Sequence, residues 1–221
     1  MVKPFLSFVT RACNRPIMLE QNILSVQAQT CGDWEHIIIY DDQQRGMSWA
    51  DKALDKYKRS VTGAYRYILD DDCLLLDFSF VAALRAIVES HGTAPDLIMV
   101  RSKRPPGPPS NETIFPSVRV WGGKVAHGTT NCLCYVMCSH LWDRFIFEFG
   151  TKPWGGDWHF LKAALPHVNK TVWYPAIVAE AQQLGRGRLF EPTHAGWFED
   201  LAIEYGYKYD KAHGVWRATG V

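Results

Sequence analysis

The feature that most constrains the fold is a pair of apolar runs that each end abruptly in aspartates. Residues 34–40 hold three consecutive isoleucines and are followed by Asp41 and Asp42, and residues 65–69 are followed by three aspartates at 70–72. A continuous run of apolar and β-branched side chains is typical of a strand buried on both faces, as in a parallel sheet. The two runs therefore predict parallel strands that carry carboxylates at their carboxyl ends.

Helical patterns separate these strands from two further strand-like runs, at residues 5–10 and 96–100. The helices are expected to open near Pro16, Ser48 and Phe78. Alternating strands and helices predict an α/β fold, with a mostly parallel central sheet and helices on both of its faces. Ligands of such sheets bind beyond the carboxyl ends of the strands, and both groups of aspartates are expected at that edge.

The second half of the chain changes character at residues 101–116, where five prolines predict a loop. Beyond this loop, short runs predict a small additional sheet, from strands at 117–121, 130–137, 171–174 and 177–181, and helices at 139–147 and 158–164. A chain of 221 residues suits a single domain.

The composition argues against several classes of partner and compartment. A formal net charge of +1 gives no overall basic balance of the kind that nucleic-acid binding usually needs. The six cysteines form no C-x-x-C pair, which favours free thiols in a reducing compartment over a zinc knuckle. No run reaches the roughly 20 apolar residues of a membrane span. We therefore expect a cytoplasmic protein with no membrane span.

The aspartates at 70–72 suggest a metal site. Three adjacent carboxylates would repel one another if buried, and a divalent cation such as Mg²⁺ or Mn²⁺ removes that repulsion while also bridging to phosphates. In extended backbone Asp70 and Asp72 point to the same side, so both could reach one cation. A solvated acidic turn or a helix cap would also explain the triplet.

Asp157 is a candidate general base. It follows Gly155 and Gly156 and is flanked by Trp154 and Trp158. Partial desolvation by the tryptophans would raise the pKa of the carboxylate and improve it as a base. An aspartate before a helical stretch is also an ordinary N-cap, so both interpretations stay open.

Several motifs in order resemble the opening of family-2 glycosyltransferases of the GT-A fold. They are the segments at residues 7–10, 14–16, 24–30 and 34–42, a Tyr-Ile-Leu-Asp-Asp-Asp segment at 67–72 that looks like the family's D-x-D motif, and Gly156-Asp157 where the family carries its catalytic E-D pair. The resemblance covers roughly residues 5–181. It implies a nucleotide-binding half at residues 1–100 and an acceptor-side half at 101–221.

The resemblance also implies an inverting, metal-dependent transfer of a sugar from a nucleotide-sugar, with a UDP-sugar as the expected donor. The donor would be contacted by Thr10, Arg11, Asp41 or Asp42, Asp70 and Asp71, and by Arg186 and Arg188 in a basic loop. Mn²⁺ or Mg²⁺ would be held by Asp70 and Asp72, with His194 as a further ligand. Asp157 would deprotonate the acceptor hydroxyl, which belongs to a saccharide or to a modified nucleobase in DNA.

Two departures from the family pattern keep other functions open. Only residues 43–69 separate the first acidic pair from the D-x-D motif, where the family has a further helix–strand unit, and Gly156 replaces the acid of the E-D pair. One alternative is a nucleotidyltransferase, although the glycine-rich phosphate loop of that class is missing after the first strand. The other is an inactive module that binds nucleotide-sugars.

Overall fold

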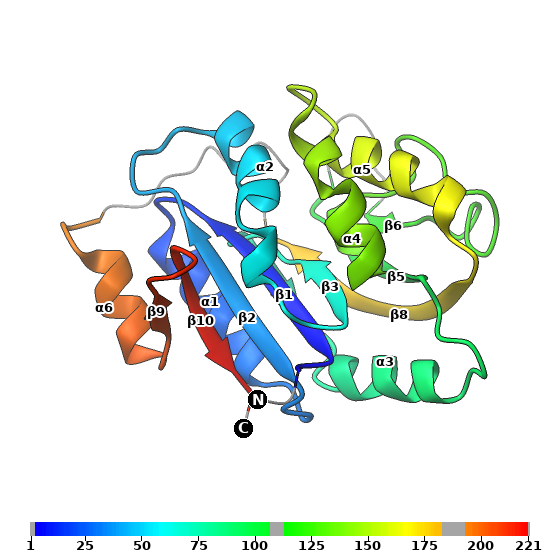
Figure 1. Cartoon of the computed structure of the whole chain (residues 1–221), viewed down its shortest axis with the longest axis horizontal. Coiled ribbons are helices and arrows are strands. Elements are labelled where there is room, and N and C mark those ends of the chain that lie inside the picture. The colour runs from blue at the N-terminus through cyan, green and yellow to red at the C-terminus, as the bar shows by residue number, and fades with distance from the viewer. Residues whose placement is uncertain (1–2, 107–112, 183–192, 221) are drawn as a thin grey trace.

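The computed structural model describes residues 3–106, 113–182 and 193–220, and in these residues ten strands form one sheet (Figure 1). The spatial order is β4-β8-β5-β7-β3-β1-β2-β10-β9, and β6 pairs with β5. The strands are β1 (Leu6–Ala12), β2 (Trp34–Tyr40), β3 (Tyr65–Ile68), β4 (Cys73–Leu75), β5 (Leu97–Lys103), β6 (Ile114–Phe115), β7 (Tyr135–Cys138), β8 (Thr171–Ala181), β9 (Lys208–Asp210) and β10 (Val215–Thr219).

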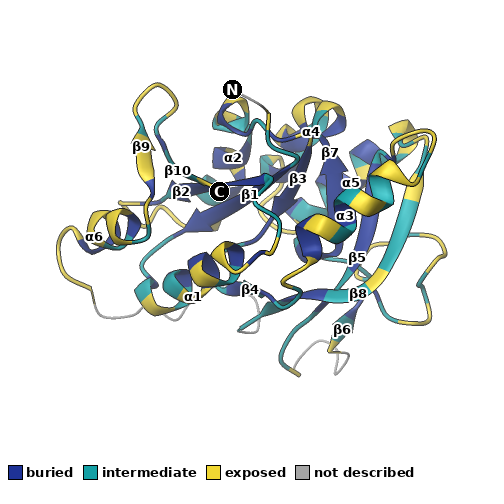
Figure 2. Cartoon of the chain, turned by 90° about the horizontal axis from the view of Figure 1, so that it is seen from below, coloured by how far each residue is buried: buried dark blue, intermediate teal, exposed yellow. Residues whose placement is uncertain are grey.

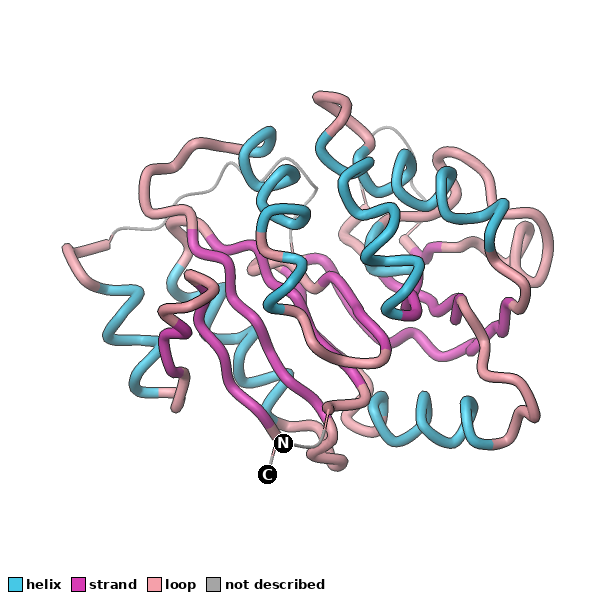
Figure 3. The backbone as a smooth tube through the Cα atoms, viewed as in Figure 1, coloured by secondary structure: helices cyan, strands magenta, loops and turns pink. Residues whose placement is uncertain are grey.

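The four strands predicted in the first half of the chain all run in one direction. β1 pairs in parallel with β2 and with β3, and β7 lies between β3 and β5, antiparallel to both. β1, β2, β3 and β5 therefore end at the same edge of the sheet, which confirms the predicted α/β fold. β1 begins and β10 ends at the opposite edge (Figure 3). Strands from the second half extend this same sheet.

Helices cover both faces of the sheet, with α1 and α2 on opposite sides of β1 and β2 (Figure 2). The helices are α1 (Pro16–Gln27), α2 (Met47–Lys56), α3 (Phe80–Glu89), α4 (Ser139–Phe145), α5 (Gly156–Ala164) and α6 (Trp197–Glu204). Short 3₁₀ turns occupy Lys58–Ser60, Cys132–Cys134, Ile146–Gly150 and Leu165–His167. As predicted, α1 opens at Pro16, where the missing N–H donor has no intrahelical partner to lose.

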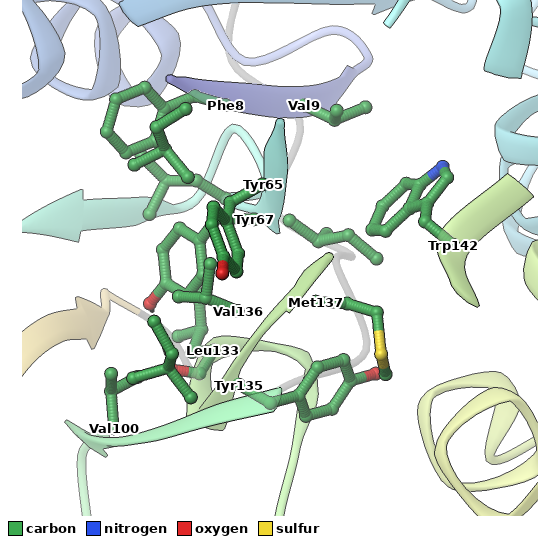
Figure 4. Close-up of a cluster of buried hydrophobic side chains, with 14 of the residues drawn as sticks. Phe8, Val9, Tyr65, Tyr67, Val100, Leu133, Tyr135, Val136, Met137 and Trp142 are labelled. Carbon is green, nitrogen blue, oxygen red and sulfur yellow. Dashed lines mark hydrogen bonds between the residues drawn. The ribbon is translucent and has the colours of Figure 1, made fainter. Parts of the chain in front are cut away.

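The main hydrophobic core joins the parallel strands to β7 and α4 (Figure 4). Phe8 and Tyr67 meet edge to face with ring centroids 6.2 Å apart, and the Tyr67 hydroxyl donates to the Leu133 carbonyl oxygen at 2.9 Å. Trp142 of α4 is also buried against this cluster. The core therefore fixes the strand ends and the Cys132–Cys134 turn relative to one another.

Two predictions for the second half are wrong. Residues 117–121 form turns, and residues 171–181 form one continuous strand through Pro175. The register between β5 and β8 shifts from Met99–Trp173 to Arg101–Ile177, so Pro175 lies at an irregularity where no ladder donor is needed. The aromatic tail, for which no element was predicted, forms α6, β9 and β10.

Candidate active site

A pocket of about 350 Å³ lies at the carboxyl ends of β1, β2 and β3, between those strands and α2. Its wall holds charged residues from separate segments of the chain, among them Arg11, Arg15, Asp41, Asp70, Asp72 and Arg104. Trp49 of α2 and Cys132 also line it. The strand ends therefore converge on one pocket, as the placement of the aspartates predicts.

Arg11, near the end of β1, joins two carboxylates from different elements. Its Nε donates to Asp70 Oδ1 at 2.7 Å and its Nη2 to Asp70 Oδ2 at 2.6 Å, while Nη1 pairs with Asp51 of α2. Burial by itself would lower the pKa of Arg11, but the charges of Asp70 and Asp51 outweigh it and hold the pKa well above its ordinary value. Arg11 is therefore a permanent cation that links α2 to β3.

Arg15 pairs with the other two aspartates of the triplet. Its Nη1 donates to Asp72 Oδ2 at 3.0 Å and its Nη2 lies 2.5 Å from Asp71 Oδ1. Asp71 is fully buried, and its Oδ2 accepts the Cys13 N–H at 2.9 Å. Burial raises the pKa of Asp71 to about 8, against the opposing charge of Arg15. Asp70 and Asp72 thus line the pocket, while Asp71 points into the protein.

The donor set of the triplet fits a divalent cation in part. Mg²⁺ and Mn²⁺ take carboxylate oxygens, and two carboxylates combined with substrate phosphates are enough for Mg²⁺. In this structure, however, Asp70 is paired with Arg11, and Asp71 and Asp72 are paired with Arg15. A cation at Asp70 and Asp72 would therefore replace arginine contacts with metal contacts.

Asp41 and Asp42 differ in exposure, so the structure distinguishes two residues that the sequence made equally good candidates for contact with the donor. Asp41 is buried in the pocket wall, where its carboxylate accepts Arg45 Nε at 2.8 Å and the Gly46 N–H at 3.2 Å. The Asp42 side chain is 63% exposed, and it also accepts from Arg45. The Arg45 guanidinium lies 3.8 Å from the Trp49 ring centroid. The structure thus brings Asp41, rather than Asp42, to the pocket.

Thr10 does not reach the pocket in this structure. Its side chain is fully buried, where the hydroxyl donates to the Leu69 carbonyl oxygen at 2.5 Å and lies 2.7 Å from His36 Nε2. The strand was predicted to end at Thr10 but continues to Ala12, so Thr10 is an internal residue of β1. Arg11, the next residue, points to the pocket side instead.

Asp157 lies in the first turn of α5, and Gly155, with a left-handed φ of 72°, is the N-cap. The N-cap interpretation of Asp157 is therefore wrong. Its Oδ1 accepts the Trp158 N–H at 2.8 Å, and burial raises the pKa of its carboxyl above the ordinary value, while that N–H and the charges of Arg11 and His127 oppose the rise. The charges of Arg11 and Asp70 act on the Asp157 carboxyl, but Asp157 is not among the residues that line the pocket.

Close packing surrounds Gly156, the residue before Asp157. A Cβ atom built at this position would overlap the Phe149 carbonyl oxygen and come within 2.6 Å of Phe149 Cδ1. The turn at Ile146–Gly150 therefore leaves no room for a side chain before Asp157.

The remaining predicted residues lie in the segment that precedes α6. His194 is exposed, and its Nδ1 lies 3.0 Å from the Ala195 carbonyl oxygen. The neighbouring Thr193 hydroxyl donates to Asn14 Oδ1 at 3.0 Å, which ties this segment to the loop after β1. Arg186 and Arg188 lie outside the described residues.

No role was predicted from the sequence for Arg15, Arg45, Trp49 or Asp51. A role for Asp51 could have been predicted, because Asp51 lies on the buried side of the amphipathic helix α2 and a buried acid needs a partner. The role of Arg15 could not have been predicted, because its partners lie 56 and 57 positions further along the chain.

No protein-family model matches the sequence, and no curated protein matches it. Solved structures do match. TarS from S. aureus superposes with a TM-score of 0.60 at 13% identity, covering 91% of this chain and 39% of TarS. TarS 1–349 in complex with UDP-GlcNAc has a TM-score of 0.60 at 12% identity, covering 95% of this chain and 69% of that one.

The mannosyltransferase PcManGT from Pyrobaculum calidifontis, in complex with GDP-Man and Mn²⁺, superposes with a TM-score of 0.57 at 15% identity, covering 85% of this chain and 59% of PcManGT. The chain has a GT-A-like glycosyltransferase fold. At these identities the likeness concerns the fold alone, and the chain spans about two fifths of the full TarS structure. No helix among the described residues of this GT-A-like domain is long and apolar enough to cross a membrane.

Proposed function

We propose that this chain is a glycosyltransferase that takes a sugar from a nucleotide-sugar, with UDP as the nucleotide, and passes it to a hydroxyl acceptor. The observation that carries the proposal is the convergence of Asp41, Asp70, Asp72 and two arginines on one pocket at the carboxyl ends of the strands. Solved structures of the same fold hold UDP-GlcNAc or GDP-Man, which supports a nucleotide-sugar as the ligand class.

The pocket offers a separate group for each part of such a donor. The Asp41 carboxylate would accept hydrogen bonds from the base or the ribose, and the Trp49 ring would supply an apolar face. Arg11 and Arg15 are planar, permanently charged donors suited to a diphosphate. Their charge would also stabilise the negative charge that grows on the leaving diphosphate.

A divalent cation, Mn²⁺ or Mg²⁺, would be held by Asp70 and Asp72 in this proposal. It would supply Lewis-acid stabilisation of the diphosphate when bound. PcManGT was solved with Mn²⁺, which supports a metal in proteins of this fold. Because both aspartates are paired with arginines, Arg11 and Arg15 would turn from the carboxylates toward the phosphates when a cation binds.

Asp157 would take the proton of the acceptor hydroxyl. Its raised pKa makes it a stronger base than an ordinary carboxylate, and the Trp158 N–H fixes the orientation of one oxygen. Attack from the face opposite the leaving diphosphate would invert the anomeric carbon. The acceptor is proposed to be a saccharide, and a modified nucleobase in DNA is the second candidate.

A thermal-shift screen of UDP, GDP and UDP-sugars, each with and without Mn²⁺, tests the proposal. We expect UDP to raise the melting temperature of the wild type and of Asp42→Asn, but much less that of Asp41→Asn, since only Asp41 lines the pocket. Failure of every nucleotide to stabilise the wild type would overturn the proposal. Stabilisation without donor hydrolysis or transfer would instead identify an inactive nucleotide-sugar-binding module, and pyrophosphate release from a nucleoside triphosphate would identify a nucleotidyltransferase.

A further inference from the structure

A second cluster of functional side chains lies at the other edge of the sheet. Asp96 directly precedes β5, Cys138 ends β7 and His140 lies in the first turn of α4. β5 and β7 are antiparallel, so the start of one meets the end of the other, and the Cys138 N–H donates to the Asp96 carbonyl oxygen at 2.9 Å. The pocket residues Cys132 and Arg104 lie beyond the opposite ends of these two strands. The cluster is therefore separate from the donor pocket.

The three side chains form a nearly equilateral triangle of ligand atoms. Cys138 Sγ lies 3.9 Å from Asp96 Oδ1 and 3.8 Å from His140 Nε2, and His140 Nε2 lies 3.7 Å from Asp96 Oδ1. A tetrahedral zinc ion with bonds of about 2.0–2.3 Å separates its ligands by about 3.3–3.8 Å. The observed triangle is a few tenths of an ångström wider than one face of such a tetrahedron. The His140 Nδ1 lies nearer to Cys138 Sγ, at 3.2 Å, so the exposed imidazole would also turn to present one nitrogen to the ion.

The Asp96 carboxylate is already oriented for this role. Its Oδ2 accepts the backbone N–H of Asn169 at 2.7 Å and that of Lys170 at 3.3 Å, which leaves Oδ1 directed at the thiol and the imidazole. Hydrogen bonds of this kind fix ligand orientation around bound metals. His140 is mostly exposed, so an ion can enter from solvent and keep a water in its fourth position.

We propose that Asp96, Cys138 and His140 bind a zinc ion that ties the start of β5 to the end of β7 and to α4. Within the described residues, this is the one group of three or more His, Cys, Asp or Glu side chains whose ligand atoms lie within 4.8 Å of one another. One sulfur, one imidazole nitrogen and one carboxylate oxygen suit Zn²⁺, whereas Mg²⁺ and Mn²⁺ prefer oxygen donors. On binding, the thiol proton leaves to solvent and a zinc–thiolate bond forms.

The test titrates Co²⁺ and then Zn²⁺ into the full chain after metals have been removed with a chelator. We expect one equivalent of Co²⁺ to give the absorption band of a cobalt–thiolate bond, and Zn²⁺ to displace it. Cys138→Ser should abolish the band and His140→Ala should weaken Zn²⁺ binding by at least about tenfold. Cys132→Ser and Cys31→Ser, which remove thiols elsewhere in the chain, should keep both signals.

Absence of a one-equivalent cobalt–thiolate band in the wild type would overturn the proposal, as would a band that survives in Cys138→Ser. If Cys138→Ser does not fold, His140→Ala decides the matter, because the His140 side chain is mostly exposed and its removal leaves the core intact. The thermal shift produced by UDP with Mn²⁺ should be the same in His140→Ala and in the wild type. Failure of the zinc site and failure of the donor pocket are therefore told apart.

Discussion

The two edges of the sheet place aspartates in contrasting surroundings. At the carboxyl edge, Asp70 is paired with the guanidinium of Arg11 in β1, and Asp71 and Asp72 are paired with that of Arg15 in the loop after β1. At the other edge, Asp96 meets a thiol and an imidazole, and backbone N–H groups hold its second oxygen. The comparison shows that the partner groups set what an aspartate at a strand end can bind. Fixed cations suit a diphosphate, and mixed sulfur, nitrogen and oxygen donors suit zinc.

The largest effect is expected from removing a cation at the carboxyl edge. Arg11→Met leaves the largely buried carboxylates of Asp51 and Asp70 without their shared partner, and we expect a loss of about 3–5 kcal/mol in the free energy of unfolding. Arg11→Lys keeps the charge but not the planar fork, so its loss should be smaller. Urea denaturation measures both. A loss below about 1 kcal/mol in Arg11→Met would show that the cluster does not depend on this cation.

The second prediction concerns Asp157, the proposed base. Asp157→Asn keeps an oxygen that can accept the Trp158 N–H but cannot take a proton, so we expect kcat to fall by about 10²–10⁴-fold with little change in stability. Asp200→Asn is the matched control, because Asp200 is an exposed acid in the first turn of another helix, α6. Equal activity of the two variants would rule out Asp157 as the base.

The third prediction is a pH dependence that originates at Asp71. Burial raises the pKa of Asp71 to about 8 in the folded chain, so the folded state keeps a proton that the unfolded state loses near pH 4. The contribution of this group to stability is therefore present below about pH 4 and is lost as the pH rises toward 8, by at most about 1.4 kcal/mol per pH unit. The stability of Asp71→Asn minus that of the wild type should rise over this window.

Chemical denaturation at intervals between pH 4 and pH 8 measures this difference. A difference that falls with pH would mean that the ion pair with Arg15 dominates over burial, so that Asp71 is charged in the folded chain.

The smallest effect is expected at the opposite edge. In the metal-free chain, His140→Ala should change the free energy of unfolding by no more than about 0.5 kcal/mol, because the side chain is mostly exposed. Added Zn²⁺ should stabilise the wild type and leave this variant almost unchanged. A large loss without metal would mean that His140 stabilises this edge through its contacts with Cys138 and Asp96, without a metal ion.

The sequence predicted the first half of the fold well, because its strands and helices are periodic and long. β2 spans Trp34–Tyr40 as predicted, and β3 and α1 agree within a residue or so. The second half depends on partners far away in the chain. β10 pairs with β2, with Trp216 opposite Ile38, and no local pattern in the aromatic tail predicts that pairing.

The candidate site was also predicted only in part from the sequence. The edge of the sheet at which the aspartates gather followed from strand direction, and alternation placed Asp70 and Asp72 on the same side. Asp71 was expected to contact the donor but is buried and does not line the pocket. The sequence did not predict which residue of a neighbouring pair faces the pocket, because that depends on where each strand ends. Thr10 and Arg11 were both expected to contact the donor; β1 runs two residues past its predicted end, and of the two only Arg11 lines the pocket.

The close approach of Phe149 to Gly156 limits the substitutions open to this chain. A glutamate could enter at position 156 only after the backbone of the Ile146–Gly150 turn had moved, so no single replacement places a second acid beside Asp157. Directed evolution toward a two-acid centre would have to begin by remodelling that turn. Until then, Asp157 would be the only acid at this point of the chain.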